Sequence, residues 1–362
     1  MQFSNLKNKK VLVLGLSVTG FAAAKFLCRA GTKCYLSDSN KLADENKDKA
    51  KILEEYGVQL EFDGHTEEFI KESDFCILSP SIPPNSDILK ELDRLKIPYF
   101  SDIELAYKIK PERTKIIAIT GTNGKTTTTM LITHILNRKF NACQAGNVGV
   151  SPLDYLFPLA DSSLEADSKS KINALHTKEP DFLVIEASSY QLHYTKDFAP
   201  DMAVFCNLTP DHINWHGNIE NYFYDKAKMF KNMGENTHAI LNFDDEHTRG
   251  LSSKAKKHFF RLNSLGNKLD AYIKNGKIYY GDEFIINIDD VPIVGAHNLQ
   301  NVMCGAIAGK IAGLPNDEIK SGIVSFKAPK HRCEFVIKKD GISYYNDSKA
   351  TNPEASNVAI TD

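Results

Sequence analysis

Two stretches of the chain repeat the same order of apolar run, glycine turn and helical pattern. The first is residues 11–30, with its turn at 15–20, and the second is residues 116–136, with its turn at 121–126. Strand, glycine turn and helix form the opening unit of a parallel, doubly wound sheet. The repetition predicts two α/β domains with a boundary near residue 100.

Further short apolar runs predict the remaining strands of both domains. We expect strands at 33–37, 75–79 and 99–101 in the first domain, and at 182–186, 202–208 and 239–243 in the second. Residues 161–171 are rich in Ser, Asp and Lys and indicate a surface insertion. After Lys330 the pattern predicts strands at 335–337 and 343–346 and then the start of a helix.

The predicted domains are residues 1–102, 103–328 and 329–362. The last has only 34 residues, and chains below about 40 residues rarely fold without staples. We therefore expect a Rossmann-like N-terminal domain, a central P-loop ATPase-like parallel-sheet domain, and the truncated start of a third Rossmann-like domain.

Composition narrows the class of protein. With 362 residues, 42% hydrophobic and 25% charged residues and a formal charge of −2, the chain is typical of an ordinary soluble protein and not of a general nucleic-acid binder. No stretch approaches the roughly 20 apolar residues of a membrane span. The seven cysteines form no Cys-x-x-Cys pair, which favours a reducing compartment. We expect a cytoplasmic protein, a monomer, with no nucleic-acid or membrane partner.

The second glycine turn reads Gly121-Thr122-Asn123-Gly124-Lys125-Thr126-Thr127. Backbone N–H groups of such a turn and a helix N-terminus form an anion site, Lys125 supplies a cation, and Thr126 offers a hydroxyl to Mg²⁺. The usual phosphate loop has four residues between its glycines, and here Ile119 stands at the position of the earlier glycine. The alternative is a chance match, which the strand before the loop and the helix after it disfavour.

Other polar residues follow predicted strands or lie on predicted helices. Glu186 ends an apolar strand, where a carboxylate can bind Mg²⁺, although a solvated strand end would look the same. His212 follows another strand and could equally be structural. On the helix at 222–231, Lys226 and Lys228 are by default solvated. Asn298 is a competent helix N-cap.

Five motifs occur in an order that resembles the Mur ligases, ATP-dependent enzymes that add amino acids to the UDP-linked peptidoglycan precursor. They are the phosphate loop, Glu186-Ala187-Ser188-Ser189, Asn207-Leu208-Thr209-Pro210-Asp211-His212, His297-Asn298-Leu299-Gln300-Asn301 and His331-Arg332. The run at 346–352 and the opening turn at 15–20 most resemble the D-glutamate-adding branch. The likeness covers the whole chain and implies the substrates UDP-N-acetylmuramoyl-L-alanine, D-glutamate and ATP.

The resemblance also implies a role for individual residues. The UDP-linked substrate would contact Val18, Thr19, Asp38, Ser79 and Pro80 of the first domain, and Asn147, Ser188, Gln191 and His212. ATP would be held by Gly121, Thr122, Asn123, Gly124, Lys125, Thr126 and Thr127, with Asn298 and Asn301 near adenine and Arg332, Asp347 and Lys349 closing from the third domain.

Two magnesium ions are implied as well. One would lie on Thr126 and Glu186, and the second would be attended by His212 and Lys226, the latter as a carbamylated lysine. Lys226 is preferred to Lys228 because it follows Tyr222 by four residues, as in the family. The implied catalytic residues are Lys125, His212, Lys226 and Lys349.

The implied reaction passes through an acyl phosphate, formed when the substrate carboxylate attacks the γ-phosphate of ATP, and then aminolysed by D-glutamate. Two positions depart from the family pattern, since Ser17 and Ser81 replace glycines of the predicted UDP site. The alternatives are a related amide ligase such as a folylpolyglutamate synthase, an NAD-dependent dehydrogenase suggested by the turn at 15–20 and Asp38, and a catalytically silent nucleotide-binding fragment.

Overall fold

A computed structural model describes residues 6–156, 179–262, 269–350 and 356. The predicted insertion at 161–171 and most of the helix predicted after residue 346 lie outside these residues. Contacts group the chain into two compact units. The first comprises residues 1–114, 145–180 and 187–198, and the second comprises residues 115–144, 181–186 and 199–362. The domain bounds derived from sequence remain a prediction.

The first unit is built on a parallel sheet in the order β3-β2-β1-β4-β5. Its strands are β1 (Lys10–Leu14), β2 (Lys33–Asp38), β3 (Gln59–Phe62), β4 (Phe75–Leu78) and β5 (Tyr99–Phe100). Its helices are α1 (Val18–Arg29), η2 (Asp44–Asn46), α2 (Lys47–Glu55), α3 (Glu67–Ile70), α4 (Asp87–Arg94), α5 (Asp102–Ile109), η3 (Pro152–Tyr155) and α7 (Ser189–His193). Strand order reverses between β1 and β4, the place where doubly wound sheets bind ligands.

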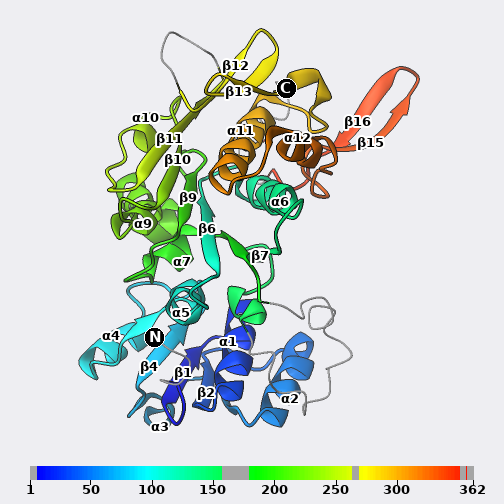
Figure 1. Ribbon diagram of the computed structural model, residues 1–362. Helices are drawn as coiled ribbons and strands as arrows, with labels where there is room; N and C mark the ends of the chain where they lie inside the picture. Colours follow the sequence, from blue (N-terminus) through cyan, green and yellow to red (C-terminus); the bar gives the residue numbers. More distant parts are fainter. Residues whose placement is uncertain (1–5, 157–178, 263–268, 351–355, 357–362) are drawn as a thin grey trace. The chain divides into compact units, whose positions relative to one another are not determined.

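The second sheet is mixed and has the order β14-β13-β12-β11-β10-β9-β6-β8-β7 (Figure 1). Its strands are β6 (Lys115–Thr120), β7 (Ala142–Gly146), β8 (Phe182–Glu186), β9 (Met202–Phe205), β10 (His238–Asn242), β11 (Lys256–Arg261), β12 (Ala271–Lys274), β13 (Lys277–Tyr280) and β14 (Glu283–Asn287). The helices of this unit are α6 (Lys125–Leu136), α8 (Ile213–His216), α9 (Ile219–Lys231), α10 (Glu246–Arg249), η4 (Ile288–Asp290), α11 (Ala296–Ile311) and α12 (Asn316–Val324). A separate hairpin pairs β15 (Glu334–Lys339) with β16 (Ile342–Asn346).

The predicted parallel pairing is confirmed for β8, β6, β9, β10, β11 and β12. The prediction did not include the antiparallel strands at one end of the central sheet. Strands β12, β13 and β14 pair antiparallel. Asn275 and Gly276 join β12 to β13 with φ values of 49° and 68°. An Asn-Gly pair readily takes positive φ at both positions, which is the geometry of a tight hairpin. That pair was the sequence signal for the antiparallel end.

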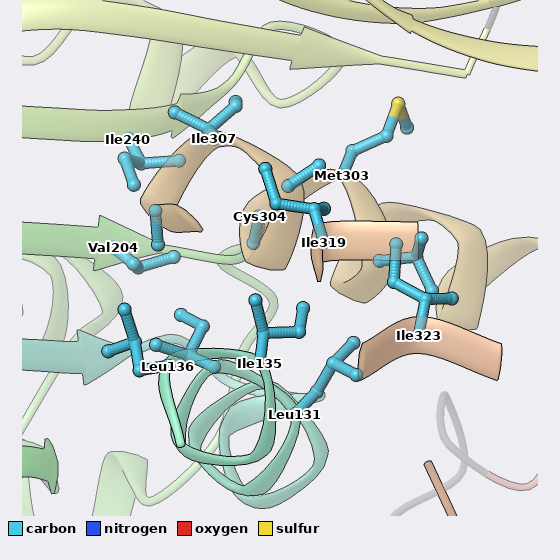
Figure 2. Packing of buried hydrophobic residues seen from close by; sticks show 14 of the residues in the cluster. Leu131, Ile135, Leu136, Val204, Ile240, Met303, Cys304, Ile307, Ile319 and Ile323 are labelled. Atoms are coloured by element: carbon cyan, nitrogen blue, oxygen red, sulfur yellow. The ribbon is translucent and has the colours of Figure 1, made fainter. Parts of the chain in front are cut away.

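The core of the second unit lies between the sheet and helices α6, α11 and α12. Figure 2 shows Leu131, Ile135 and Leu136 of α6 facing side chains of α11 and α12, with Val204 and Ile240 contributed by the sheet. At Gly322 of α12 an added Cβ would lie 3.0 Å from the Cα of Ile135. This close approach of α12 to the end of α6 leaves little room for a larger residue than glycine at position 322.

The predicted strand at 202–208 is too long, because β9 ends at Phe205. The last bond to β6 runs from the amide of Cys206 to the carbonyl of Thr120, at 3.0 Å. Beyond it the backbone bonds to the phosphate loop, where the carbonyl of Asn207 accepts from the amide of Thr122 at 3.0 Å. The apolar run continued through residues that serve the loop and not the sheet.

Candidate active site

The phosphate loop connects β6 to α6 as predicted, and glycine is required at both of its glycine positions. Gly121 has φ +151° and Gly124 has φ +83°. A Cβ at Gly124 would lie 2.8 Å from Oδ1 of Asn301, and one at Gly121 would lie 3.0 Å from Cβ of Cys206. The loop therefore packs directly on α11 and on the segment after β9.

Asn207 and Thr209, which follow β9, hold the phosphate loop in place. The Oδ1 atom of Asn207 accepts from the amide of Asn123 at 2.9 Å, and its Nδ2 donates to the carbonyl of Asn123 at 3.1 Å. The hydroxyl of Thr122 donates to the carbonyl of Thr209 at 2.9 Å and accepts from the amide of Thr209 at 3.0 Å. These side-chain bonds replace the backbone pairing that an irregular loop lacks.

Two lysines converge on one carbonyl of the loop. The Nζ atom of Lys125 donates to the carbonyl of Gly121 at 2.9 Å and to that of Thr122 at 2.7 Å. The Nζ atom of Lys226, from α9, donates to the same Gly121 carbonyl at 2.8 Å. Lys226 is only 1% exposed, so it is not the solvated helix-face charge that its position on a helix suggested.

Burial lowers the pKa of Lys226 well below its usual value, and the positive charge of Lys125 lowers it further. Burial also lowers the pKa of Lys125, while the charge of Glu186 acts in the opposite direction on both lysines. Glu186 ends β8 and is 2% exposed. The alternative of a solvated strand end is therefore wrong.

His212 lies at the N-terminus of α8 with a left-handed backbone, φ +53°. Its Nδ1 is 3.5 Å from Oδ1 of Asp211, and its side chain is 45% exposed. Burial of part of the ring lowers the pKa of His212, and the charges of Lys226 and Lys125 contribute to this shift. The structure thus brings His212 into the electrostatic range of both lysines.

Helix α11 begins after Gly295, which is its N-cap. The prediction of Asn298 as the N-cap is therefore wrong. Asn298 lies inside the first turn, where its Nδ2 donates to the carbonyl of Val294 at 2.6 Å. Its Oδ1 accepts from Nδ2 of Asn301 at 3.0 Å, and Oδ1 of Asn301 accepts from the hydroxyl of Thr128 at 2.9 Å. Gly295 has φ +104°, a conformation that asparagine would adopt less readily.

The segment after residue 328 supplies one contact to the loop. The Nη2 atom of Arg332 donates to the hydroxyl of Thr126 at 3.0 Å. Asp347 accepts from the amide of Cys333 through Oδ1 at 3.0 Å, and the amide of Lys349 donates to the carbonyl of His331 at 3.1 Å. These bonds organise the base of the hairpin, and no described contact joins Asp347 or the Lys349 side chain to the loop.

In the first unit a cleft of about 440 Å³ lies at the carboxyl ends of β1, β2 and β4. Its lining includes Gly15 and Ser17 after β1, Asp38 and Asn40 after β2, and Ser79 after β4, together with Leu16, Ser39, His65, Ser81, Ile82, Pro83, Ser86, Asp87 and Ile88. Asp38 accepts from the amide of Leu16 at 2.8 Å. Two of the predicted substrate residues, Asp38 and Ser79, thus line one cleft.

Position 17, where the family pattern has a glycine, does not require one in this chain. Its backbone is extended, with φ −84°, and its hydroxyl caps α1 by accepting from the amide of Gly20 at 3.2 Å. The hydroxyl of Ser79 donates to Ser17 at 2.7 Å. Gly15 does need its glycine, since it has φ +91° and a Cβ there would lie 2.8 Å from Cβ of Ser79.

The other predicted substrate residues of this unit lie outside the lining of that cleft. Val18 and Thr19 form the first turn of α1, Pro80 follows Ser79, and Asn147 is exposed in the turn after β7. Ser188 and Gln191 form a capping box at α7. Gln191 also donates to Oδ1 of Asp102 at 3.1 Å, so one of its side-chain hydrogen bonds is made inside the unit.

Sequence reasoning missed a buried group beside Lys226. Nδ1 of His216 lies 2.8 Å from Oδ2 of Asp225, and both side chains are almost fully buried. The ring centroid of Tyr222 lies 5.1 Å from that of His216 and 4.4 Å from Nζ of Lys226. The sequence did contain a signal for this group, because Tyr222 precedes Asp225 by three residues and Lys226 by four, and residues at these spacings share one helix face.

No group of three His, Cys, Asp or Glu side chains that could hold a metal occurs among the described residues. Thr126 and Glu186 nevertheless offer oxygen ligands beside the loop. Mg²⁺ is commonly bound through one or two such groups together with substrate phosphates and water. The donor set therefore fits magnesium bound with a nucleotide, and it does not fit a metal held by protein alone. Within the described ranges no helix is long and apolar enough to cross a bilayer.

A phosphate loop on a mixed α/β sheet, with buried lysines and a carboxylate around it, defines a nucleotide-dependent enzyme class, and comparison with known proteins specifies which one. The profile of the Mur ligase middle domain matches residues 119–309, and that of the MurD-like N-terminal domain of Mur ligases matches residues 9–100. The chain belongs to the Mur ligase family.

Individual relatives agree with this assignment. The chain is 38% identical to UDP-N-acetylmuramoylalanine–D-glutamate ligase of Thermoanaerobacter pseudethanolicus, over 98% of this chain and 75% of that protein. Among solved structures, UDP-N-acetylmuramate:L-alanyl-γ-D-glutamyl-meso-diaminopimelate ligase from Neisseria meningitides matches with a TM-score of 0.60 and 16% identity, over 89% of this chain and 99% of that one. MurF ligase from Thermotoga maritima in complex with ADP matches with a TM-score of 0.55 and 18% identity, over 99% and 72%. The two structures support the fold.

Proposed function

We propose that this chain carries the nucleotide and UDP-substrate sites of an ATP-dependent ligase that joins D-glutamate to UDP-N-acetylmuramoyl-L-alanine in peptidoglycan synthesis. The observation that carries the proposal is the convergence of Lys125, Lys226 and Glu186 on the phosphate loop, in a chain 38% identical to a relative with that named activity. No described side chain near the loop is needed as a nucleophile, because phosphoryl transfer depends mainly on positioning and charge neutralisation.

The first unit would bind the UDP end of the substrate. Its cleft lies at the strand-order reversal of a doubly wound sheet, where ligands bind in such folds. Asp38 and the paired hydroxyls of Ser17 and Ser79 are among the polar groups that line it. The other proposed contacts to the substrate are Val18, Thr19, Pro80, Asn147, Ser188, Gln191 and His212.

In the reaction we infer, a carboxylate oxygen of the substrate attacks the γ-phosphorus of ATP, and the bond to the β-phosphate oxygen breaks to release ADP. The amine of D-glutamate then attacks the carbonyl carbon of the acyl phosphate, loses a proton and expels phosphate. Lys125 would leave its two carbonyl partners to neutralise the β- and γ-phosphates. The loop amides would hold the remaining phosphate oxygens.

Magnesium would supply charge neutralisation on the phosphates, held by Thr126 and Glu186. Arg332 would then turn from the Thr126 hydroxyl toward the nucleotide, with Asn298 and Asn301 near the base and with Asp347 and Lys349 approaching from the third segment. His212 would attend a second ion together with Lys226.

The environment of Lys226 supports its carbamylation. Only an uncharged amine reacts with CO₂, and burial and Lys125 together lower the pKa of Lys226. A carbamate would turn a buried cation beside Lys125 into an anion, which removes a like-charge repulsion and creates an oxygen ligand. Lys226→Ala would lose this ligand, and added bicarbonate would not restore it.

The test is calorimetric titration of the 362-residue chain with UDP-N-acetylmuramoyl-L-alanine and, separately, with ADP and Mg²⁺. We expect saturable binding of both and no binding of NAD, the control for a dehydrogenase. Phosphate release from ATP would then be measured with D-glutamate and with L-glutamate as the matched control. Binding of NAD in place of the UDP compound would refute the proposal, as would absence of nucleotide binding in a folded sample.

A further inference from the structure

The corner between α8 and α9 places His216 against the first turns of α9. Gly217 turns the chain with φ +86°, and Oδ1 of Asn218 caps α9 by accepting from the amide of Asn221 at 2.7 Å. The Nδ2 atom of Asn221 donates to the carbonyl of His216 at 2.9 Å. The corner is thus tied on both sides, and His216 has no exposed side-chain surface.

Three buried residues of α9 face this histidine or the phosphate loop. Tyr222 is 1% exposed, Asp225 is 4% exposed and Lys226 is 1% exposed. Burial of a carboxylate is costly unless the charge is paired. Oδ2 of Asp225 pairs with Nδ1 of His216 at 2.8 Å, and its Oδ1 lies 3.2 Å from Nζ of Lys228. The buried pair fixes the histidine ring in one orientation.

Tyr222 contacts His216, Lys226 and the phosphate loop. Its ring centroid lies 5.1 Å from that of His216 and 4.4 Å from the Nζ atom of Lys226, which donates to the Gly121 carbonyl. Its hydroxyl is 3.3 Å from that of Thr122 in the loop. One ring therefore contacts the histidine, the buried amine and the phosphate loop.

We propose that His216 and Asp225 are positioning residues, which hold Lys226 at the phosphate loop through the ring of Tyr222. This inference rests on the proposed function for its consequence, since Lys226 is a proposed ligand of the nucleotide-bound ion. Mutation of a residue that orients a metal ligand without binding the metal commonly lowers the metal affinity by about 10- to 100-fold. His216 and Asp225 would act in this way without touching substrate or nucleotide.

The experiment compares ring-removing and ring-keeping variants. His216→Leu removes the hydrogen bond to Asp225, Tyr222→Leu removes the ring, and Tyr222→Phe keeps the ring and loses only the hydroxyl. Tyr224→Leu is the matched control, because Tyr224 lies on the same helix and is 56% exposed. For each variant the affinity for ADP with Mg²⁺, the ¹³C signal of a lysine carbamate in ¹³C-bicarbonate, and the melting temperature are measured.

We expect His216→Leu and Tyr222→Leu to weaken binding of ADP with Mg²⁺ by about tenfold or more and to lose the carbamate signal. Tyr222→Phe and Tyr224→Leu should stay close to the unaltered chain in both measurements. Binding of UDP-N-acetylmuramoyl-L-alanine, whose proposed contacts apart from His212 lie in the first unit, should change much less. A lower melting temperature with unchanged nucleotide affinity and carbamate signal would show a merely structural role and overturn the inference.

Crystal structures of the unaltered chain and of His216→Leu provide a readout that does not depend on the proposed function. The inference requires the Nζ atom of Lys226 to leave the Gly121 carbonyl in the variant and to stay there in the unaltered chain. An Nζ atom that stays in place in both would refute the positioning role. If the unaltered chain fails to bind ADP with Mg²⁺, the proposed function fails, and this structural comparison still decides the inference.

Discussion

Replacing Thr122 by valine removes one hydroxyl from the phosphate loop and leaves the shape of the side chain almost unchanged. Thr122 is 5% exposed, and its hydroxyl both donates to the carbonyl of Thr209 at 2.9 Å and accepts from its amide at 3.0 Å. In the variant the amide of Thr209 loses its acceptor. An unsatisfied buried donor costs about 1–3 kcal/mol, and burial of the added methyl offsets about 0.8 kcal/mol of this.

We therefore expect Thr122→Val to lower the free energy of unfolding by about 1 kcal/mol. If the loss falls on the anchored form of the loop alone, the affinity for ADP with Mg²⁺ falls by up to about 5-fold. Thr122→Ser keeps the hydroxyl and should retain most of the affinity. Urea unfolding and calorimetric titration measure the two quantities.

Thr129 offers the matched control in the same unit. It lies in α6 and is fully buried, and its hydroxyl has no hydrogen-bond partner among the described residues. Thr129→Val exchanges this buried hydroxyl for a methyl group, so we expect unchanged or slightly higher stability and unchanged nucleotide affinity. Equal losses in Thr122→Val and Thr129→Val would refute the reasoning, because the two changes differ only in the hydrogen bonds that are removed.

Three further outcomes are expected. Lys125→Met should weaken ADP binding by about 10- to 100-fold, the value of a charge-assisted hydrogen bond, with UDP-substrate binding unchanged; equal affinity in a calorimetric titration would contradict the role of Lys125. Gly15→Ala should destabilise the first unit by at least about 1 kcal/mol, because its φ is +91° and the new Cβ would lie 2.8 Å from that of Ser79, and should weaken binding of the UDP compound; thermal unfolding as stable as that of the unaltered chain would contradict this. Burial raises the pKa of Asp102 above its usual 3.8, so the folded state binds this proton more tightly than the unfolded state, and stability should fall as pH rises from the unfolded to the folded pKa. Asp102→Asn keeps an acceptor for Gln191, and urea unfolding of this variant should lack that fall in stability. The same pH profile in the variant and the unaltered chain would be evidence against the role of Asp102.

Much of the fold was predictable because its elements have strong local signals. Residues 182–186 were predicted as a strand, and β8 has these bounds; the helix predicted to end at Leu136 is α6. The antiparallel end of the central sheet was not predicted, although Asn275-Gly276 marks its hairpin. The run at 202–208 was predicted as one strand, because an apolar pattern does not distinguish sheet pairing from pairing with a neighbouring loop.

Some residues of the candidate site could likewise be predicted from local sequence, and others could not. A glycine turn between a strand and a helix identified Gly121 to Thr126, since backbone conformation and anion binding depend on neighbouring residues alone. From the residues alone, Lys226 and Lys228 were expected to be solvated and Asn298 to be a helix N-cap, because a helix face or a cap position fits several roles until its partners are known. Only the tertiary contacts show Lys226 buried at the Gly121 carbonyl, and Lys228 paired with Asp225.

By itself the sequence determined the two glycine turns, the parallel units around them and the order of motifs shared with the Mur ligases. These features follow from local conformational preference and hydrophobic period, which act within a few residues. Tertiary structure alone decided the pairing of His216 with Asp225 and the contact of Tyr222 with Thr122. Those contacts join residues of separate elements, and which buried polar groups become partners depends on where packing of the core brings those elements together.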